Sequence, residues 1–124
     1  MHILMCNDDG ILADGLRHLA SYLSQYYRIT VVAPANEQSA KSHALTTEVP
    51  LKLDACNGED ENPRLYALTG TPSDCMKFGL SYLLADDMPD LVISGINHGF
   101  NLGSDVLYSG TVSAAMESGF YGIP

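Results

Sequence analysis

The sequence predicts a three-layer α/β/α fold with a mostly parallel sheet, in a single domain over residues 1–124. Short apolar runs that suit buried strands alternate along the chain with stretches of helical periodicity. Such alternation implies parallel strands whose connecting helices cover both faces of the sheet. The 124 residues, 46% of them hydrophobic and 17% charged, suffice for one hydrophobic core.

The first half of the chain contains the clearest elements. Residues 2–6 form an apolar run that suits a buried strand, and a helical pattern then begins at Leu12. Its further apolar positions are Leu16, Leu19, Ala20 and Leu23. Residues 28–33 are a β-branched run closed by Pro34, which indicates a second buried strand. Residues 35–47 are polar and without a period, and a loop of this length suggests function.

Two further strands and a helix follow. Residues 49–53 alternate weakly and could form a short strand, for which Pro50 favours an edge position. Residues 64–68 predict another strand. Thr71 is a good N-cap, and Pro72 and Asp74 suit the first turn of a helix that should run to about residue 85.

The last elements are a strand over residues 91–93 and a helix over residues 111–118. A βαβ pattern would return to the sheet with another strand after this helix, but only Tyr121-Gly122-Ile123-Pro124 remains. We therefore expect a domain that is truncated at its C-terminus.

Composition excludes several classes of function. The formal charge of −9 repels a nucleic-acid polymer, and no apolar run approaches the ~20 residues of a membrane span. No basic segment precedes the first strand, so we expect no signal peptide. Cys6, Cys56 and Cys75 lack metal-site spacing, and free thiols fit a cytoplasmic protein.

A pair of carboxylates, Asp8 and Asp9, follows the first strand directly. Open α/β sheets bind ligands at the carboxyl ends of their strands. Two adjacent like charges need an offset, and Mg²⁺ or Mn²⁺ suits carboxylate oxygens. The alternative is a solvated Asp-Asp-Gly turn, which these residues alone do not exclude.

A glycine-rich segment supplies a second group of polar residues. Residues 95–124 hold six of the eleven glycines, and among them lie Asn97, Asn101, Asp105 and Tyr108. Ser109-Gly110-Thr111 opens the last predicted helix, where free N–H groups and hydroxyls can bind an anion. An anion site built without basic side chains would matter here, because no Lys or Arg follows Lys77 in the sequence. The alternative for Ser109 and Thr111 is ordinary helix capping.

Two histidines, His43 and His98, fall near this predicted site. A role as acid or base is conceivable for either, but a loop histidine is more often simply solvated. His2 and His18 are expected to be structural.

Five ordered blocks resemble those of the SurE family of stationary-phase survival proteins. The blocks are Asn7-Asp8-Asp9-Gly10, Ala33-Pro34 with Gln38-Ser39, Gly70-Thr71-Pro72-Ser73-Asp74-Cys75, the run from Ser94 to Asn101, and Tyr108-Ser109-Gly110-Thr111-Val112. Members of this family are metal-dependent nucleoside monophosphate phosphatases, and the blocks extend over essentially the whole chain. The resemblance implies a Rossmann-like α/β/α domain.

The resemblance also implies a site and partners. One divalent ion per subunit, Mg²⁺ or Mn²⁺, would be held by Asp8, Asp9, Ser39 and Asn97. Asp8, Asp9 and Asn97 would be catalytic, and the substrate would be bound by Asn101, Ser109, Gly110 and Thr111. The substrates would be nucleoside 5'- and 3'-monophosphates, and for some relatives short polyphosphate. Family members continue for roughly as many residues again and would form homodimers or homotetramers.

A receiver-type signalling domain is the competing hypothesis. Such domains have a similar length and an acidic pair after the first strand, here Asp8 and Asp9 binding Mg²⁺. Asp54 would be the phosphorylated residue. A receiver also needs a lysine after a late strand, and no lysine follows Lys77.

Overall fold

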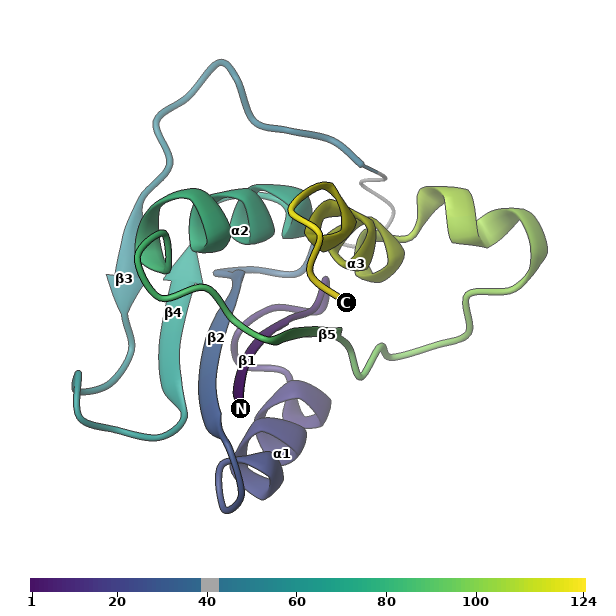
Figure 1. The fold of residues 1–124 in the computed structure, drawn as a ribbon. Coiled ribbons are helices and arrows are strands. Elements are labelled where there is room, and N and C mark those ends of the chain that lie inside the picture. The colour runs from purple at the N-terminus through teal and green to yellow at the C-terminus, as the bar shows by residue number, and fades with distance from the viewer. Residues whose placement is uncertain (39–42) are drawn as a thin grey trace.

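The computed structural model describes residues 1–38 and 43–124. Their strands are β1 (His2–Cys6), β2 (Arg28–Pro34), β3 (Leu53–Ala55), β4 (Arg64–Leu68) and β5 (Leu91–Ser94). The helices are α1 (Asp14–Leu23), α2 (Pro72–Phe78), a π-helical extension of α2 (Gly79–Leu83), a 3₁₀ helix (Gly103–Tyr108) and α3 (Gly110–Phe120). The strands form one sheet in the order β3-β4-β2-β1-β5 (Figure 1).

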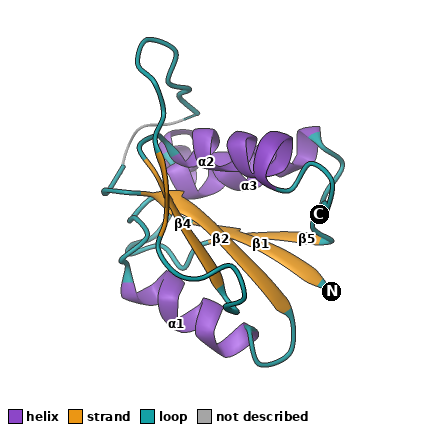
Figure 2. Cartoon of the chain, turned by 90° about the vertical axis from the view of Figure 1, so that its left-hand side faces the viewer, coloured by secondary structure: helices purple, strands orange, loops and turns teal. Residues whose placement is uncertain are grey.

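The sheet is covered on both faces, as the sequence predicted. Helix α1 lies on one face, and α2 and α3 lie on the other (Figure 2). Successive side chains of a strand point to opposite faces. In β1, Leu4 packs with Met76 of α2 and with Leu80 of its π-helical extension. On the other face, Ile3 packs in the cluster that contains Leu16 of α1. The three-layer prediction is confirmed.

Strands β1, β2, β4 and β5 are mutually parallel. Their carboxyl ends therefore meet at one edge of the sheet, and the loops that follow them start from that edge. Only β3, among the described strands, is antiparallel to its neighbour; it pairs with β4 through Leu53 and Leu68. The predicted convergence of the strand-end loops is thus confirmed for the backbone.

Several predicted boundaries were wrong. The first helix begins at Asp14, not Leu12, whose side chain is 75% exposed in the preceding turn. The short strand lies at Leu53–Ala55 rather than at 49–53, because it pairs with β4 only from Leu53 onward. The last helix is longer than predicted, and the 3₁₀ helix before it was missed because its glycine-rich sequence has no clear period.

The second predicted helix changes its geometry at Gly79. The segment from Gly79 to Leu83 is π-helical, and the Leu84 N–H donates to the Gly79 carbonyl at 2.9 Å. Gly79 faces the sheet, where an added Cβ would lie 3.4 Å from the Leu4 side chain. An added methyl group would therefore make an ordinary van der Waals contact with the sheet, so a glycine is not required for this packing.

The three cysteines are unpaired, and Cys6 and Cys75 are buried in the core. Burial is the largest cause of a raised pKa for the Cys75 thiol. A thiol that stays protonated is a packing residue rather than a nucleophile. No helix of residues 1–38 and 43–124 has both the length and the apolar character needed to cross a membrane.

Candidate metal and phosphate site

The turn after β1 is braced by Asn7. Its side-chain amide donates to the Gly10 carbonyl and accepts from the Gly10 N–H, both at 3.1 Å. Gly10 has a φ of +102°, which glycine adopts readily. The Asn7 side chain is fully buried. This closed turn fixes the backbone of Asp8 and Asp9 at the carboxyl edge of the sheet.

Asp8 is buried against the start of α3. The Thr111 hydroxyl donates to Asp8 Oδ1 at 2.7 Å. A Cβ added to Gly110 would lie 2.8 Å from the Asp8 Cβ and 3.2 Å from Asp8 Oδ2. Only glycine lets the helix start come so near to Asp8, whose carboxylate is thereby placed beside the N-terminus of α3.

Asp9 is partly exposed and contacts the segment that follows β5. The backbone N–H of His98 donates to Asp9 Oδ2 at 2.9 Å. The Asn97 amide nitrogen donates to the Gly99 carbonyl at 3.3 Å, which orients its oxygen the other way. The connection between Asp9 and the 97–99 segment was not predicted, because backbone donors have no signature in the sequence.

Two shallow cavities meet at these residues. The first, of about 290 Å³, is bordered by Asp8, Asn97, Asn101 and Ser109. His98, Gly99, Phe100, Asp105 and Tyr108 complete its lining. The second, of about 340 Å³, is bordered by Asp9, Asn97 and His98 together with the start of α1. The two cavities share Asn97 and His98, so they bring Asp8, Asp9, Asn101 and Ser109 close to one another, whereas Gly110 and Thr111 line neither cavity.

Ser39, the remaining predicted metal ligand, lies outside the described residues. The residue before it, Gln38, donates its backbone N–H to the Asp8 carbonyl at 2.8 Å. The described N-terminal part of the loop after β2 thus contacts the Asn7–Gly10 turn.

The donor set around the opening suits a hard divalent cation. Asp8 and Asp9 each engage one carboxylate oxygen with a protein donor, and Asn97 adds an amide oxygen. Mg²⁺ binds through one or two carboxylates and keeps several waters. No group of three or more His, Cys, Asp or Glu side chains suited to a metal occurs in residues 1–38 and 43–124. The residues fit Mg²⁺ or Mn²⁺.

Helix α3 begins at Ser109-Gly110-Thr111, the residues for which the sequence predicted anion binding. The first N–H groups of a helix have no acceptor within the helix. At α3 they belong to Gly110 and Thr111, while the Ser109 hydroxyl accepts from the Val112 N–H at 3.2 Å. Ser109 is therefore the N-cap of α3, which is the capping alternative named for it from the sequence. The Thr111 hydroxyl donates to Asp8, so it orients that carboxylate and does not point into the cavity.

His43 has a partner that sequence reasoning missed. Its Nε2 lies 2.7 Å from Glu117 Oε2, and Glu117 is buried on α3. Glu117 was overlooked because a single acid in a helix is normally solvated. The His98 side chain is exposed, and it is the backbone of His98 that contacts Asp9.

The receiver hypothesis is wrong. Asp54 lies on β3 and forms an ion pair with Lys52 at 2.9 Å. Two strands, β4 and β2, separate β3 from β1, and neighbouring strands are about 4.8 Å apart. Asp54 therefore cannot share a metal ion with Asp8 and Asp9.

Comparison with known proteins identifies the relatives of this chain. The family model described as "Survival protein SurE" matches residues 3–124. The chain is 55% identical over its whole length to the 5'-nucleotidase SurE of Thermoanaerobacter sp. (strain X514), and covers 48% of that protein. It is 51% identical over 123 residues to the 5'-nucleotidase SurE of Vibrio vulnificus (strain YJ016), covering 46% of it.

A solved structure matches the fold. The crystal structure of the SurE protein from Aquifex aeolicus superposes with a TM-score of 0.85 at 43% sequence identity, over all of this chain and 48% of that one. The chain thus spans about half the length of the relatives it matches. The resemblance noted in the sequence is confirmed by these matches.

Proposed function

This chain belongs to the SurE family of survival proteins, and we propose that it is the site-bearing part of a metal-dependent phosphatase that hydrolyses nucleoside 5'- and 3'-monophosphates to nucleoside and phosphate. The curated relatives are named 5'-nucleotidase SurE at 49–55% identity. Short polyphosphate is a further candidate substrate, because it presents the same terminal phosphoryl group.

The observation that carries the proposal is the contact between Asp8 and the start of α3. The Thr111–Asp8 hydrogen bond and the close approach of Gly110 place a carboxylate beside a helix N-terminus. Two anionic groups, the carboxylate and a phosphate, would then lie close together. Such an arrangement is stable only with a cation between them, which is the arrangement of a metal-dependent phosphatase.

The metal ligands in this proposal are Asp8, Asp9 and Asn97, with Ser39 supplying a hydroxyl from the loop after β2. When bound, the metal supplies Lewis-acid activation of a phosphoryl oxygen and of a water molecule. Thr111 and the His98 N–H each hold one oxygen of a carboxylate, which leaves the second oxygen of Asp8 and of Asp9 for the ion. Asp9, the more exposed of the two, would also orient the attacking water.

The phosphate would be bound by the Gly110 and Thr111 N–H groups and the Ser109 hydroxyl, at the N-terminus of α3. These donors stabilise the negative charge that develops on the phosphoryl oxygens. Asn101, on the wall of the first cavity, would contact the sugar or phosphate. The net charge of −9 favours a small ligand bound through a metal over a polymer bound by basic side chains.

The test is phosphate release from AMP and GMP by the full-length protein, with Mn²⁺, with Mg²⁺ and with EDTA. We expect metal-dependent release, and we expect Asp9→Asn to abolish it while the circular dichroism spectrum is unchanged. Asp54→Asn is the matched control, because two strands separate this carboxylate from β1, and the variant should keep the wild-type rate of turnover. Unchanged turnover in Asp9→Asn would remove Asp9 from the mechanism.

The compartment and assembly belong to the same proposal. The three unpaired cysteines are compatible with a reducing cytoplasm. The segment between β5 and α3 extends away from the body of the molecule (Figure 1) and exposes Phe100, Leu102 and Leu107. Exposed apolar groups of this size favour self-association into the proposed dimer or tetramer, which light scattering would measure.

A further inference from the structure

The 3₁₀ helix before α3 forms one wall of the first cavity. Two of its residues, Asp105 and Tyr108, border the same space as Asp8 and Ser109. In a 3₁₀ helix, side chains three positions apart lie on the same side. Asp105 and Tyr108 have this spacing, whereas the two residues between them do not border the cavity. The helix therefore presents a carboxylate and a phenol ring together to the space in front of Ser109.

Neither side chain is bonded to the part of the chain that the structure describes. Within residues 1–38 and 43–124, Asp105 and Tyr108 form no ion pair, side-chain hydrogen bond or ring contact. Tyr108 is 61% exposed, and Asp105 is also exposed. Asp8 of the same cavity, by contrast, is buried and accepts from Thr111 at 2.7 Å. Both groups of this wall are thus available to a ligand.

Tyr108 directly precedes Ser109, the N-cap of α3. Because consecutive Cα atoms are about 3.8 Å apart, its ring starts next to the hydroxyl that is proposed to bind phosphate. In a nucleoside monophosphate, the ribose joins the phosphate to the base. A phosphate at Ser109 therefore brings the base within reach of Tyr108. The cavity, of about 290 Å³, is close to the size at which small-molecule sites begin.

The chemistry of this wall suits a nucleobase. An exposed aromatic ring is a stacking surface for any base, because every base has a planar π face. A carboxylate accepts a hydrogen bond from an exocyclic amino group, as it does from the N4 amino group of cytosine. The wall does not suit a phosphate, because the Asp105 carboxylate repels phosphate oxygens and no Lys or Arg follows Lys77 in the sequence.

We propose that Tyr108 and Asp105 bind the nucleobase of the substrate, with Tyr108 stacking on the ring and Asp105 selecting adenine and cytosine over hypoxanthine and uracil. The inference rests on the proposed function, because it takes the phosphate to be bound at the start of α3. Hypoxanthine and uracil carry a carbonyl oxygen where adenine and cytosine carry the amino group. That oxygen cannot donate to Asp105, and a desolvated carboxylate without a donor is unfavourable.

The first test measures kcat/KM of the full-length protein, with saturating Mn²⁺, for AMP and for ribose 5-phosphate, which has no base. Tyr108→Leu removes the ring and keeps an apolar side chain. We expect it to lower the ratio of kcat/KM for AMP to that for ribose 5-phosphate about tenfold, because stacking on the base is lost. Tyr108→Phe keeps the ring and should keep the wild-type ratio. An unchanged ratio in Tyr108→Leu, whether or not both values fall, would overturn the stacking role.

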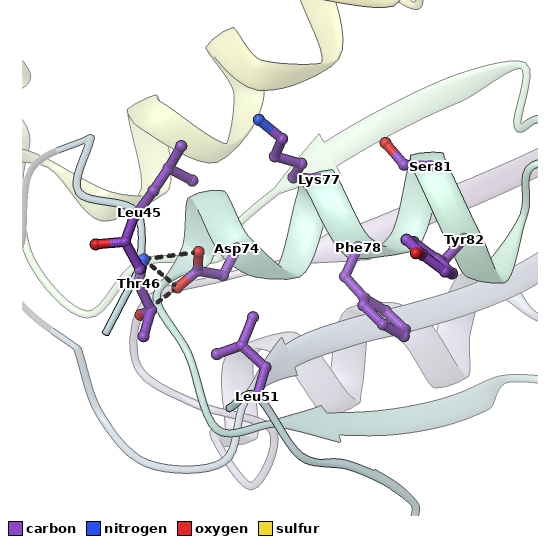
Figure 3. Close-up of a pocket in the computed structure, with 9 residues that line it drawn as sticks. Leu45, Thr46, Leu51, Asp74, Lys77, Phe78, Ser81 and Tyr82 are labelled. Carbon is purple, nitrogen blue, oxygen red and sulfur yellow. Dashed lines mark hydrogen bonds between the residues drawn. The ribbon is translucent and has the colours of Figure 1, made fainter. Parts of the chain in front are cut away.

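A separate cavity beside α2, also of about 340 Å³, supplies the control for the ring (Figure 3). Tyr82 borders this cavity and stacks on Phe78, with ring centroids 5.5 Å apart. At its other end, the Thr46 hydroxyl donates to Asp74 Oδ2 at 2.6 Å. None of the described residues that line it borders the first cavity. Tyr82→Leu should therefore keep the wild-type ratio of AMP to ribose 5-phosphate.

The second test compares AMP with IMP, in which a carbonyl replaces the amino group of the base. We expect the wild type to prefer AMP by about tenfold or more in kcat/KM, because only adenine offers Asp105 a donor at this position. The amide of Asp105→Asn can itself donate to a carbonyl oxygen, so the preference should fall below about threefold. Asp54→Asn, on β3, changes the net charge equally and should keep the wild-type preference. An equal loss for AMP and IMP in Asp105→Asn would overturn the selecting role.

Failure of the proposed function has a different signature. If the wild type releases no phosphate from AMP, IMP or ribose 5-phosphate with Mn²⁺, the proposed function is wrong and the base-binding role fails with it. If the wild type hydrolyses all three at the same kcat/KM, and Tyr108→Leu and Asp105→Asn do the same, only the base-binding role fails.

Discussion

At the scale of single residues, the closest packing in the site involves Gly110. A methyl group there would lie 2.8 Å from the Asp8 Cβ and 3.0 Å from the Pro72 ring. Because both neighbours are parts of fixed elements, Gly110→Ala must displace Asp8 or the start of α3. We predict a loss of Mn²⁺ affinity of about tenfold or more, measured by titration, since overpacking of this kind costs about 1–3 kcal/mol.

Gly119, on the same helix, provides the control for this substitution. Nothing lies within 4 Å of an added Cβ at that position. Gly119→Ala should therefore keep the wild-type Mn²⁺ affinity and stabilise α3 slightly, because alanine favours helix over glycine by about 0.5–1 kcal/mol. Equal Mn²⁺ affinity of Gly110→Ala and Gly119→Ala would show that the approach of α3 to Asp8 is not needed for metal binding.

The residues that could be predicted from the sequence are those whose chemistry is local. Asp8 and Asp9 follow a strand directly, and Ser109 precedes a helix, so their type and place were enough. The Thr46–Asp74 contact and the His43–Glu117 contact join residues 28 and 74 positions apart. Such pairs depend on tertiary packing, and a single sequence contains no signal for them.

At the scale of elements, a buried histidine, His2, begins β1 and contacts residues of the neighbouring strand β2. His2 Nε2 lies 3.0 Å from the Thr30 hydroxyl, and the Arg28 guanidinium donates to Nδ1 at 2.8 Å. Burial, followed by the positive charge of Arg28, lowers the pKa of His2 below its ordinary 6.5, against the opposing effect of Asp87. The folded state therefore favours neutral His2, in which Nδ1 accepts from Arg28.

The sign of the pH dependence follows from this lowered pKa. Above pH 6.5 His2 is neutral in both states, and its full contribution to stability is present. As the pH falls below 6.5, the unfolded chain takes up the proton first, and the free energy of unfolding decreases until the folded pKa is passed. We predict that urea unfolding at about pH 7.5 and about pH 5.5 shows a larger loss of stability for the wild type than for His2→Gln.

The exposed His18 on α1 supplies the comparison. His18→Gln should keep the wild-type difference between the two pH values, because this side chain is exposed on α1 and lies away from the His2, Arg28 and Asp87 cluster. The same pH dependence in the wild type and His2→Gln would assign the effect to other groups.

Elements were predicted well where a period or a cap was present. The four parallel strands and the start of α2 follow from apolar runs and from Thr71-Pro72. The short β3 was misplaced because its position is set by pairing with β4, and the 3₁₀ helix was missed because Gly103 and its neighbours have no periodic apolar pattern. Pairing and irregular turns are tertiary properties.

At the scale of the whole molecule, topology explains how distant blocks form one site. The order β4-β2-β1-β5 places the carboxyl ends of four parallel strands in a row, so the loops that carry the family motifs start from one edge. The alternation of strands and helices was sufficient to predict this edge, but not which donor faces which ligand atom.

The negative charge of the whole chain lets added cations stabilise it in two ways, by general screening and by specific binding. A chain of net charge −9 is destabilised by its own repulsion, which any salt screens. An ion that binds only the folded state adds about 2.7 kcal/mol at a concentration of about 100 times its dissociation constant. We therefore predict that saturating Mn²⁺ raises the melting temperature by about 10 °C beyond the effect of NaCl at the same ionic strength.

Asp9→Asn separates the two contributions, because it removes a proposed metal ligand while changing the net charge of −9 by only one unit. The variant should keep the response to NaCl, or become slightly more stable without salt, and lose the additional rise with Mn²⁺. If Mn²⁺ stabilises Asp9→Asn as much as the wild type, or no more than NaCl does, the acidic pair after β1 acts only through its charge. A rise that needs both Mn²⁺ and Asp9 ties the stability of the fold to the same carboxylates that the proposed reaction uses.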